Sequence, residues 1–538
     1  MSALLPETFQ KAITPEFLRS AAKQSSKCHV IPVRLDRAIK KYLQEQEMGH
    51  MKKKVLRLSE SFSEIKDVNR MLPMSISKEL VEDPLKSLEQ SKRWKIKSVY
   101  GEIGLAYRDD ETAAYVASRM PAVYSACYRI LKEIRRRLPG FSPAKVLDFG
   151  SGTGSAFWAL RDVWPRSLER VNLIEPSQSM QRAGLSLLQD IKKLPLIHSY
   201  GSIQSLSQDI KKSERLHDLV IASYVLGEIP SLKDRITTVR QLWNLTGDIL
   251  VLIEPGTPEG SNIISQMRSH ILWMEKRKSR KRKNASEGSS ESPAASSDGA
   301  FIVAPCPHDG PCPLAKTGKY CHFVQRMERT ESQRAYKRSG SAPLRGFEDE
   351  KFSYVAFRRG KRPQIRLGGG GRLEELLAAE PIKLLAIHGY KICSTHTMLE
   401  PWPLDGLKFE TLKELRARRN PEDLEVDYDD QFGEESDEIM PYKAHPSHES
   451  DAAESDAFTE YEDEEEGEEA GHADLGSGWG RIIFMPQKRG RRIEMDVCRS
   501  TKRDGSEGLF EHLVITKAKN PALHHQARKS FWGDLWPF

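Results

Sequence analysis

The stretch VLDFGSGTGSAFWAL, residues 146–160, decides the fold of this 538-residue chain. A short apolar run leads to Asp148, and Gly150, Gly152 and Gly154 follow before an amphipathic stretch begins. Because glycine permits tight turns and a close approach of backbone to ligand, this order predicts a strand, a ligand-binding turn and a helix. Glu175 ends the next apolar run, VNLIEP, at a position where a carboxylate accepts hydrogen bonds from ribose hydroxyls.

The pattern around this stretch predicts a parallel, doubly wound sheet. Short runs rich in β-branched residues (AKVLDFG, RVNLIEP, HDLVIASYVLGE and GDILVLIEPG) alternate with helical stretches over about 130 residues. A dinucleotide site usually carries G-x-G-x-x-G, whereas this chain has G-x-G-x-G with an acid two residues before the first glycine. That spacing resembles motif I of the S-adenosylmethionine-dependent methyltransferases.

A second segment, HDLVIASYVLGEI (217–229), resembles the fourth-strand motif of the same enzymes and places Ser223, Tyr224 and Glu228 near its end. The resemblance implies an α/β methyltransferase-like Rossmann fold. It also implies that S-adenosylmethionine is bound by the strand-end acids and the glycines: Asp148, Gly150, Gly152, Gly154 and Glu175. Neither an (N/D)PP(Y/F) signature nor a Pro-Cys nucleophile occurs in that strand. A methyltransferase fold whose pocket has lost its use is therefore the alternative, and the catalytic residues are not assigned.

Composition indicates several domains and contact with a polyanion. Only 38% of residues are hydrophobic, 30% are charged, and the formal net charge is +7. Acidic residues concentrate at about 420–470, and basic residues in the first hundred positions, at 276–283 and after 487. Such segregation fits RNA binding as well as a solvated charged surface.

The division of the chain follows these shifts. We predict a helical N-terminal region (1–135), a methyltransferase-like core (136–274), a disordered basic and Ser-rich insertion (275–300), a cysteine-cluster extension with further core strands (301–416), an acidic disordered linker (417–476) and a small C-terminal β module with a basic aromatic tail (477–538). No apolar run reaches the roughly 18 residues that span a bilayer, so no membrane association is expected.

Three of the seven cysteines, Cys306, Cys312 and Cys321, lie in the stretch CPHDGPCPLAKTGKYCHF. An odd total in a large chain argues against a disulfide scaffold or a disulfide-linked partner and favours metal chemistry. Four thiolates hold zinc or an iron–sulfur cluster. Zinc sites usually contain a close C-x2–4-C pair, which is missing here, so the wider spacing favours a larger cluster. Cys393, in GYKICSTH, is the expected fourth ligand.

The remaining candidates near this stretch receive structural interpretations. His308 and His322 are alternative ligands, but polar loop or supporting roles are favoured. Cys28 and Cys127 in helical patterns, and Cys498 in a strand pattern, are expected to be small buried residues. Gly310 is expected to permit an unusual turn of the loop.

Taken together, the segments resemble a known family, the methyltransferase-like proteins of the mitochondrial small ribosomal subunit, which are related to bacterial rRNA-methylase-like proteins. The match rests on YVASRMPAVYSA, VLDFGSGTGSAFWAL, SYVLGEI, LIEPGTPEGSNII, PCPHDGPCPLAKTGKYCHFVQR and ARKSFWGDLWP. It implies a mitochondrial matrix protein that assembles the small subunit in contact with its rRNA and ribosomal proteins. It also implies a [4Fe–4S] cluster on Cys306, Cys312, Cys321 and Cys393. The N-terminal 27 residues match a transit peptide weakly.

Three functions are consistent with these observations. The first is an assembly factor that docks on rRNA, with contacts expected from Arg277–Lys283, Lys488–Arg492 and the tail residues Arg528, Lys529, Phe531 and Trp532. The second is an active rRNA methyltransferase, in which Tyr224 or Glu228 orients the acceptor. The third is an iron or redox sensor, in which loss of the cluster unfolds the 301–400 region.

Overall fold

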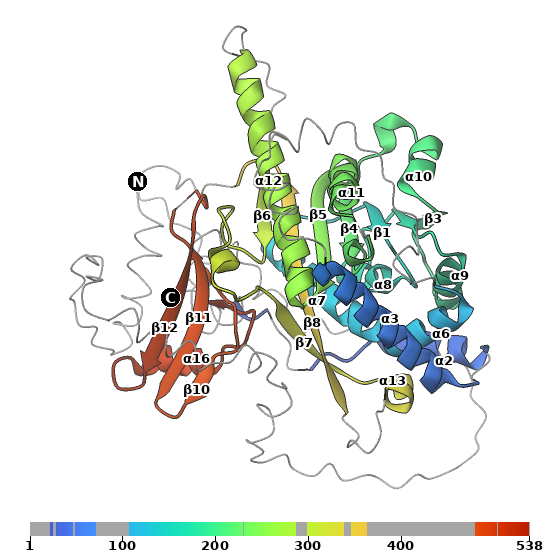
Figure 1. The fold of residues 1–538 in the computed structure, drawn as a ribbon, viewed down its shortest axis with the longest axis horizontal. Coiled ribbons are helices and arrows are strands. Elements are labelled where there is room, and N and C mark those ends of the chain that lie inside the picture. Colours follow the sequence, from blue (N-terminus) through green and yellow to red (C-terminus); the bar gives the residue numbers. More distant parts are fainter. Residues whose placement is uncertain are drawn as a thin grey trace, which may run out of the picture. The chain divides into compact units, whose positions relative to one another are not determined.

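The structure is a computed structural model that describes residues 22–24, 28–46, 49–71, 107–229, 231–286, 299–337, 346–362, 479–502 and 504–536. An eight-stranded sheet forms the core (Figure 1). Its strands are β1 Lys145–Phe149, β2 Arg170–Ile174, β3 Leu196–Tyr200, β4 His217–Ser223, β5 Thr246–Pro255, β6 Ala300–Ala304, β7 Phe323–Glu328 and β8 Phe347–Arg359.

The strand order is β3-β2-β1-β4-β5-β8-β6, with β7 also paired to β8. Strands β1 to β5 are parallel, and β8 runs antiparallel to β5, β6 and β7. The predicted doubly wound methyltransferase-like fold is therefore confirmed. The order reverses between β1 and β4, so the carboxyl ends of these strands border the crevice where such sheets bind ligands.

Helices cover the sheet because its parallel strands are apolar on both sides. They are α6 Asp109–Ser118, α7 Met120–Arg137, α8 Ser155–Val163, α9 Gln178–Leu187, α10 Ile203–Asp209, α11 Leu232–Leu245 and α12 Pro258–Ser286, with α13 Glu331–Tyr336 between β7 and β8. One core cluster packs α10, α11 and α12 on the sheet, with Trp243 and Phe357 fully buried within it. Helices α7 and α8 lie outside this cluster and pack against each other, and Phe157 and Trp158 of α8 are buried there.

Two N-terminal helices precede this core, α2 Val33–Gln44 and α3 Met51–Met71. Leu35, Ile39 and Leu43 of α2 recur at helical spacing, and all three are buried. Helix α3 contacts α6 and the short helix η3 Leu226–Glu228, which follows β4. Its Asn69 donates a hydrogen bond of 2.9 Å to the Gly227 carbonyl, so α3 reaches the turn beside the crevice.

The C-terminal module is a five-stranded antiparallel sheet with one helix. It comprises β9 Gly480–Ile482, β10 Gln487–Arg489, β11 Arg492–Ser500, β12 Gly508–Thr516, α16 Pro521–Arg528 and β13 Leu535–Trp536. Arg481 of β9 is buried against Glu133 of α7, and the Pro305 carbonyl accepts a 3.1 Å hydrogen bond from its Nε. The module therefore joins the core through desolvated charged groups.

One predicted boundary is wrong. The segment 275–300 was expected to be disordered, but α12 continues through the basic run to Ser286. At the start of this segment, Glu275 accepts a hydrogen bond of 2.9 Å from Trp243 Nε1, which anchors the helix to the core, and one of 2.6 Å from Lys278 Nζ within α12. Residues 287–298, the predicted acidic linker and Cys393 lie outside the described residues. Within the described ranges, no helix is both long and apolar enough to cross a membrane.

Candidate functional site

The glycine loop joins β1 to α8 in a conformation that needs glycine. Gly150, Gly152 and Gly154 have φ values of 69°, 53° and 87°, in the left-handed region. A Cβ at Gly150 would lie 2.6 Å from Val225 Cγ2, so the loop approaches the end of β4 closely. A Cβ at Gly152 would meet no described atom within 4 Å, which leaves open space on that side of the loop.

Asp148, in β1, is fully buried beside this loop. Neither of its carboxylate oxygens has a hydrogen-bond partner among the described residues. Burial, and secondarily the charge of Glu175, raises the pKa of Asp148 to about 7. A buried carboxylate without donors costs free energy, so this position is suited to a polar ligand that supplies them.

Glu175, which follows β2, braces the glycine loop. Its carboxylate accepts N–H hydrogen bonds from Gly152 at 2.9 Å and from Ser177 at 2.8 Å. Burial raises the pKa of Glu175 to about 7 in spite of these two donors. The sequence placed Asp148, Glu175 and the glycines at one crevice, and the structure brings them together.

The carboxyl end of β4 carries Tyr224 and Glu228. The Tyr107 hydroxyl donates a 2.7 Å hydrogen bond to Glu228, and the Tyr107 carbonyl accepts one from Ser177 Oγ, also at 2.7 Å. Burial raises the pKa of Glu228 to about 8. Tyr107, two residues before α6, thus links the segments that follow β2 and β4, an arrangement that the sequence did not indicate.

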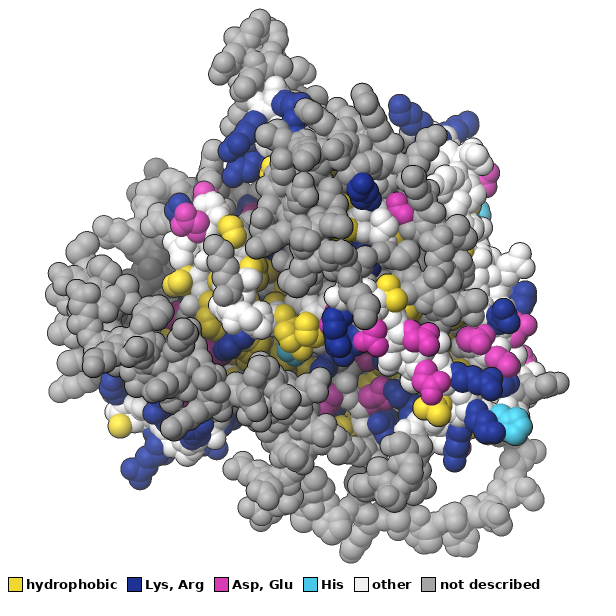
Figure 2. Space-filling model, viewed as in Figure 1, with side chains coloured by type: hydrophobic (Ala, Val, Ile, Leu, Met, Phe, Trp, Pro, Cys, Tyr) yellow, Lys and Arg dark blue, Asp and Glu magenta, His cyan; other side chains and the backbone are white. Residues whose placement is uncertain are grey.

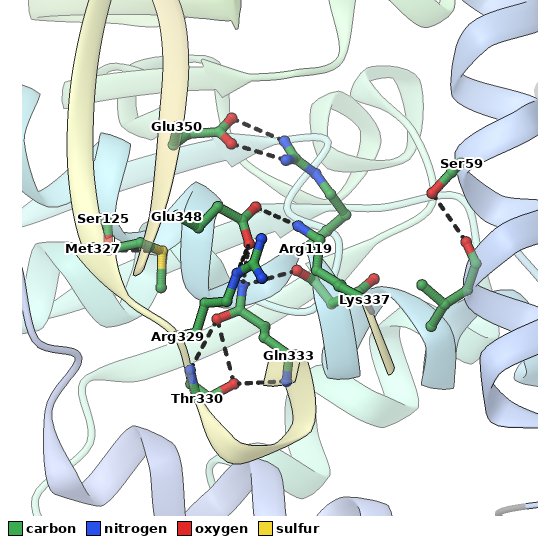
Figure 3. Close-up of polar contacts among 12 residues, drawn as sticks. Ser59, Arg119, Ser125, Met327, Arg329, Thr330, Gln333, Lys337, Glu348 and Glu350 are labelled. Atoms are coloured by element: carbon green, nitrogen blue, oxygen red, sulfur yellow. Dashed lines mark hydrogen bonds and ion pairs between the residues drawn. The ribbon is translucent and has the colours of Figure 1, made fainter. Parts of the chain in front are cut away.

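Tyr224 has a φ of 57°, a conformation that costs free energy for a residue with a bulky side chain. Its hydroxyl donates a 2.8 Å hydrogen bond to Glu350 of β8, and Arg119 lies over its ring, with Cζ 5.8 Å from the centroid. Arg119 and Glu350 form a two-pronged ion pair of 2.8 and 2.9 Å (Figure 3). These contacts hold Tyr224 in place.

A second group of polar contacts in Figure 3 surrounds Glu348, which lies on the same strand. The Glu348 carboxylate pairs with Lys337, lies 3.6 Å from Arg329 Nε and accepts a hydrogen bond of 3.4 Å from Gln333. Gln333 also donates a 3.0 Å hydrogen bond to the Ser118 carbonyl. The extension β7–α13–β8 is thereby fastened to the end of α6.

The thiol group lies where this extension meets the C-terminal module. Cys306 follows β6, Cys312 precedes the short helix η4 Pro313–Lys316, and Cys321 precedes β7. The fourth thiol nearby is Cys498 of β11, which packs with Leu314 in one cluster that also includes Cys312 and Cys321. Burial, and then the charges of Cys306 and Cys312, raises the pKa of both Cys321 and Cys498.

Of the predictions for the other cysteines, one is corrected. Cys498 lies buried in β11, as expected, and its thiol packs with Cys312 and Cys321. Cys28 was expected in a helix, but it is exposed at a bend. Cys127 is fully buried in α7, as expected. Among the described side chains, no group of three or more His, Cys, Asp or Glu residues is arranged to hold a metal ion.

The loop of the thiol group is held from two sides. Arg268 of α12 donates to the carbonyls of Gly310 at 2.7 Å and His308 at 3.1 Å. Asp309 pairs with Arg362, and its backbone N–H donates 2.7 Å to the Gly505 carbonyl. A Cβ at Gly310 would lie 2.4 Å from the Ser506 carbonyl oxygen. Gly310 has no positive φ, so it permits close packing on the module and not the unusual turn that was expected.

The two histidines of the loop differ in their surroundings. His308 is fully buried, and its Nε2 lies 3.4 Å from Cys498 Sγ. Burial, with a smaller effect from Arg268, lowers the pKa of His308 to about 4, so the ring is neutral. His322 stacks on Tyr320 and meets Trp532 edge-on, with ring centroids 4.5 Å apart in both cases. Trp532 is 6% exposed, which corrects the expectation that it contacts RNA bases.

Comparison with known proteins identifies the family. The family model described as "Mitochondrial small ribosomal subunit Rsm22" matches residues 109–373 and 442–537. The human mitochondrial ribosome assembly protein METTL17 is 31% identical over 293 residues, 53% of this chain and 58% of that protein. The mitochondrial ribosome assembly protein RSM22 of Saccharomyces cerevisiae is 21% identical over 494 residues, 79% of this chain and 67% of that protein. The chain thus spans little more than half the length of the human relative.

The solved structures to which the chain is similar include two methyltransferases. A putative RNA methyltransferase from Pyrococcus horikoshii is 12% identical, with 44% of this chain and 85% of that chain covered and a TM-score of 0.24. The plantazolicin methyltransferase BpumL is 10% identical, with 56% and 99% covered and the same TM-score. The family model, in contrast, matches more than half of the chain and includes the glycine loop, the thiol loop and most of the C-terminal module. The chain therefore belongs to the Rsm22 family of the mitochondrial small ribosomal subunit.

Proposed function

We propose that this protein acts in the mitochondrial matrix as an assembly factor of the small ribosomal subunit and binds its rRNA and ribosomal proteins. The observation that carries the proposal is the family match across 109–373 and 442–537, which includes both the core sheet and the module. Relatives in human and yeast are named mitochondrial ribosome assembly proteins. The basic segments supply the charge that an RNA-binding protein requires.

The core is proposed to bind S-adenosylmethionine through Asp148, Gly150, Gly152, Gly154 and Glu175. The fit rests on the Asp148 oxygens, which have no donor among the described residues, and on the open space beside Gly152. When bound, the cofactor supplies an activated methyl group. Asp148 would accept hydrogen bonds from the ligand's polar groups, and Glu175 would hold the loop while its remaining lone pairs face the ribose.

The thiol group is proposed to hold a [4Fe–4S] cluster on Cys306, Cys312, Cys321 and Cys498. Support comes from the donor set: Cys312 and Cys321 of the extension pack with Cys498 of the module, and the charge of Cys306 acts on both Cys321 and Cys498. A cluster takes four thiolates that lie further apart than those of one zinc ion. The sequence prediction gave Cys393 as the fourth ligand, and the variant Cys393→Ser tests that assignment below.

Methyl transfer to rRNA is the second candidate. The backbone of Tyr224, with φ at 57° beside the glycine loop, favours it because strained residues gather at functional sites. Against it, the Tyr224 hydroxyl is bound to Glu350, and Glu228 is bound to Tyr107. Both groups are thus engaged in holding the fold, and assembly without chemistry remains the first proposal.

Replacing Gly152 by Arg separates the two. The side chain would enter the open space beside the loop, so we expect Gly152→Arg to abolish binding of S-adenosylmethionine, measured by calorimetry. Gly140→Arg is the control for the added charge and volume, because a Cβ there also meets no described atom within 4 Å. In cells that lack the native protein, both variants are expected to restore small-subunit sedimentation. If neither the wild type nor the variants restore it, the assembly proposal is wrong.

If Gly152→Arg alone fails to restore the small subunit, and small-subunit rRNA also loses a methyl group, the methyltransferase is the essential activity. The rRNA is examined by mass spectrometry of its nucleosides in the same cells. A melting curve of each purified variant verifies that the fold is retained.

Metal analysis tests the cluster. Protein purified without oxygen is expected to contain iron and sulfide, and Cys498→Ser to lose most of both. Cys127→Ser, a buried thiol in α7, and Cys393→Ser should keep them. Stoichiometric zinc without a visible chromophore would overturn the cluster. Loss of iron in Cys393→Ser but not in Cys498→Ser would overturn the ligand assignment.

A further inference from the structure

The C-terminal module exposes a compact group of basic side chains, here called the basic hairpin surface. Four come from the hairpin of β10 and β11, and two from the end of α16: Lys488, Arg489, Arg491, Arg492, Arg528 and Lys529. All six are exposed. Figure 2 shows Lys and Arg side chains gathered at the lower left, over the region where Figure 1 labels β10 and α16.

Contacts between the two elements make this one surface. Arg528 Nη1 donates a 3.3 Å hydrogen bond to the carbonyl of Gly490, the turn residue of the hairpin, which has a φ of 49°. Lys488 Nζ lies 4.6 Å from the centroid of the half-buried Phe531 ring. The side chains of the hairpin and the helix end are therefore held side by side with an aromatic ring among them.

The charges on this surface repel one another. Arg489 and Arg492 are directly opposite each other across the two strands, and like charges at such positions destabilise a hairpin. Glu494 offsets one of these charges, because it pairs with Arg492 at 2.9 Å. The six cations outnumber this acid, so the surface keeps a large positive excess. An arrangement that costs stability in isolation is relieved when an anionic chain binds across it.

We propose that the basic hairpin surface binds the sugar-phosphate backbone of RNA, with Phe531 beside it as a stacking position for a base. This deepens the proposed function and rests on it. Closely spaced arginines bind phosphates in two-pronged fashion, and an aromatic ring among cations is typical of single-stranded RNA sites. An acidic protein segment would use the charges but would have no comparable use for the ring.

The other basic run, on α12, is engaged with its own helix. Lys278 is paired with Glu275, and Arg277 lies over Trp273, with Cζ 5.4 Å from the ring centroid. The α12 run serves as the control. Four of its cations are exposed, the same number as is replaced on the basic hairpin surface: Lys276, Lys278, Arg280 and Lys281.

The experiment compares two variants of the full-length chain with equal loss of charge. One carries K488Q, R489Q, R491Q and R528Q, and the other carries K276Q, K278Q, R280Q and K281Q. Affinity for a transcript of mitochondrial small-subunit rRNA is measured over a series of salt concentrations. Four lost phosphate contacts should lower the magnitude of the slope of log affinity against log salt by about 3, since each contributes roughly 0.7–0.9. The α12 variant should lose less than half as much.

Further variants test the aromatic ring and the individual arginines. Phe531→Leu keeps an apolar side chain and should weaken binding to single-stranded poly-uridine several-fold, without a change in salt slope. The single variants Arg491→Gln and Arg528→Gln serve if the fourfold variant fails to fold by circular dichroism. Each should lower the slope by about one unit or slightly less.

Four outcomes overturn the proposal. Equal losses in both fourfold variants mean that binding follows net charge alone. An unchanged slope in the hairpin variant assigns RNA to another surface and leaves the assembly function intact. Binding of an acidic peptide that is tighter than binding of RNA identifies a protein partner instead. If the wild-type chain binds no small-subunit rRNA, the surface and the rRNA-binding part of the proposed function both fail.

Discussion

The buried carboxylate of Asp148 lowers the stability of the ligand-free cofactor site at neutral pH. It is fully buried, and its pKa is raised to about 7, first by burial and then by the charge of Glu175. Because the folded-state pKa lies above the unfolded value of about 4, the contribution of Asp148 to stability is present at low pH and is lost as the pH rises toward 7. The ligand-free protein carries this cost at neutral pH.

Asp148→Asn should therefore stabilise the protein without cofactor at pH 8 by on the order of 1–3 kcal/mol relative to wild type, and much less at pH 4. The quantity to measure is the urea midpoint at both pH values. Asp209→Asn, at an exposed position, is the matched control and should show no such pH dependence. A stability difference that is the same at both pH values would show that the Asp148 charge is compensated.

At the scale of elements, the contact of α7 with β9 carries the docking of the module. Glu133 pairs with Arg481, accepts a 2.8 Å hydrogen bond from the Tyr354 hydroxyl and lies 3.2 Å from Arg137 Nε. Both Glu133 and Arg481 side chains are 3% exposed. Removal of one partner from such a pair leaves an uncompensated buried charge.

We expect Glu133→Gln to lower the free energy of unfolding by roughly 3–5 kcal/mol. Glu328→Gln removes the same charge from a pair with Arg334 in which both side chains are about half exposed, and should cost less than about 1 kcal/mol. Urea unfolding followed by tryptophan fluorescence provides both values, since Trp532 and Trp536 lie in the module. Equal effects of the two substitutions would refute a specific role for the buried pair.

For the whole molecule, the thiol group joins two parts of the chain that are distant in sequence. Cys306, Cys312 and Cys321 belong to the extension of the core sheet, and Cys498 belongs to the module. Metal binding is linked to folding wherever ligands come from separate segments. The proposed cluster would therefore stabilise the docking of the module.

Removal of the cluster with a chelator and an oxidant should reduce hydrogen-exchange protection in residues 306–321 and in β9 to β12. Strands β1 to β5, with their own apolar core, should keep their protection and serve as the internal control. Protection that falls equally in β1 to β5, or not at all in the module, would contradict this coupling.

Local sequence determined the cofactor side of this protein. The glycine loop, Asp148 and Glu175 lie within 28 residues of one another along two consecutive strands, and strand–helix alternation alone brings their ends to one edge.

The tertiary structure decided the thiol side. Cys498 follows the alternating pattern of a strand, which predicts burial but not neighbours, and only the pairing of β11 with β9 and the docking of β9 on α7 bring it to Cys321. The same holds for α12, which is anchored to the core where Glu275 contacts Trp243, a residue of another helix. Contacts between segments far apart in the chain depend on the packing of the whole core, and no local pattern encodes them.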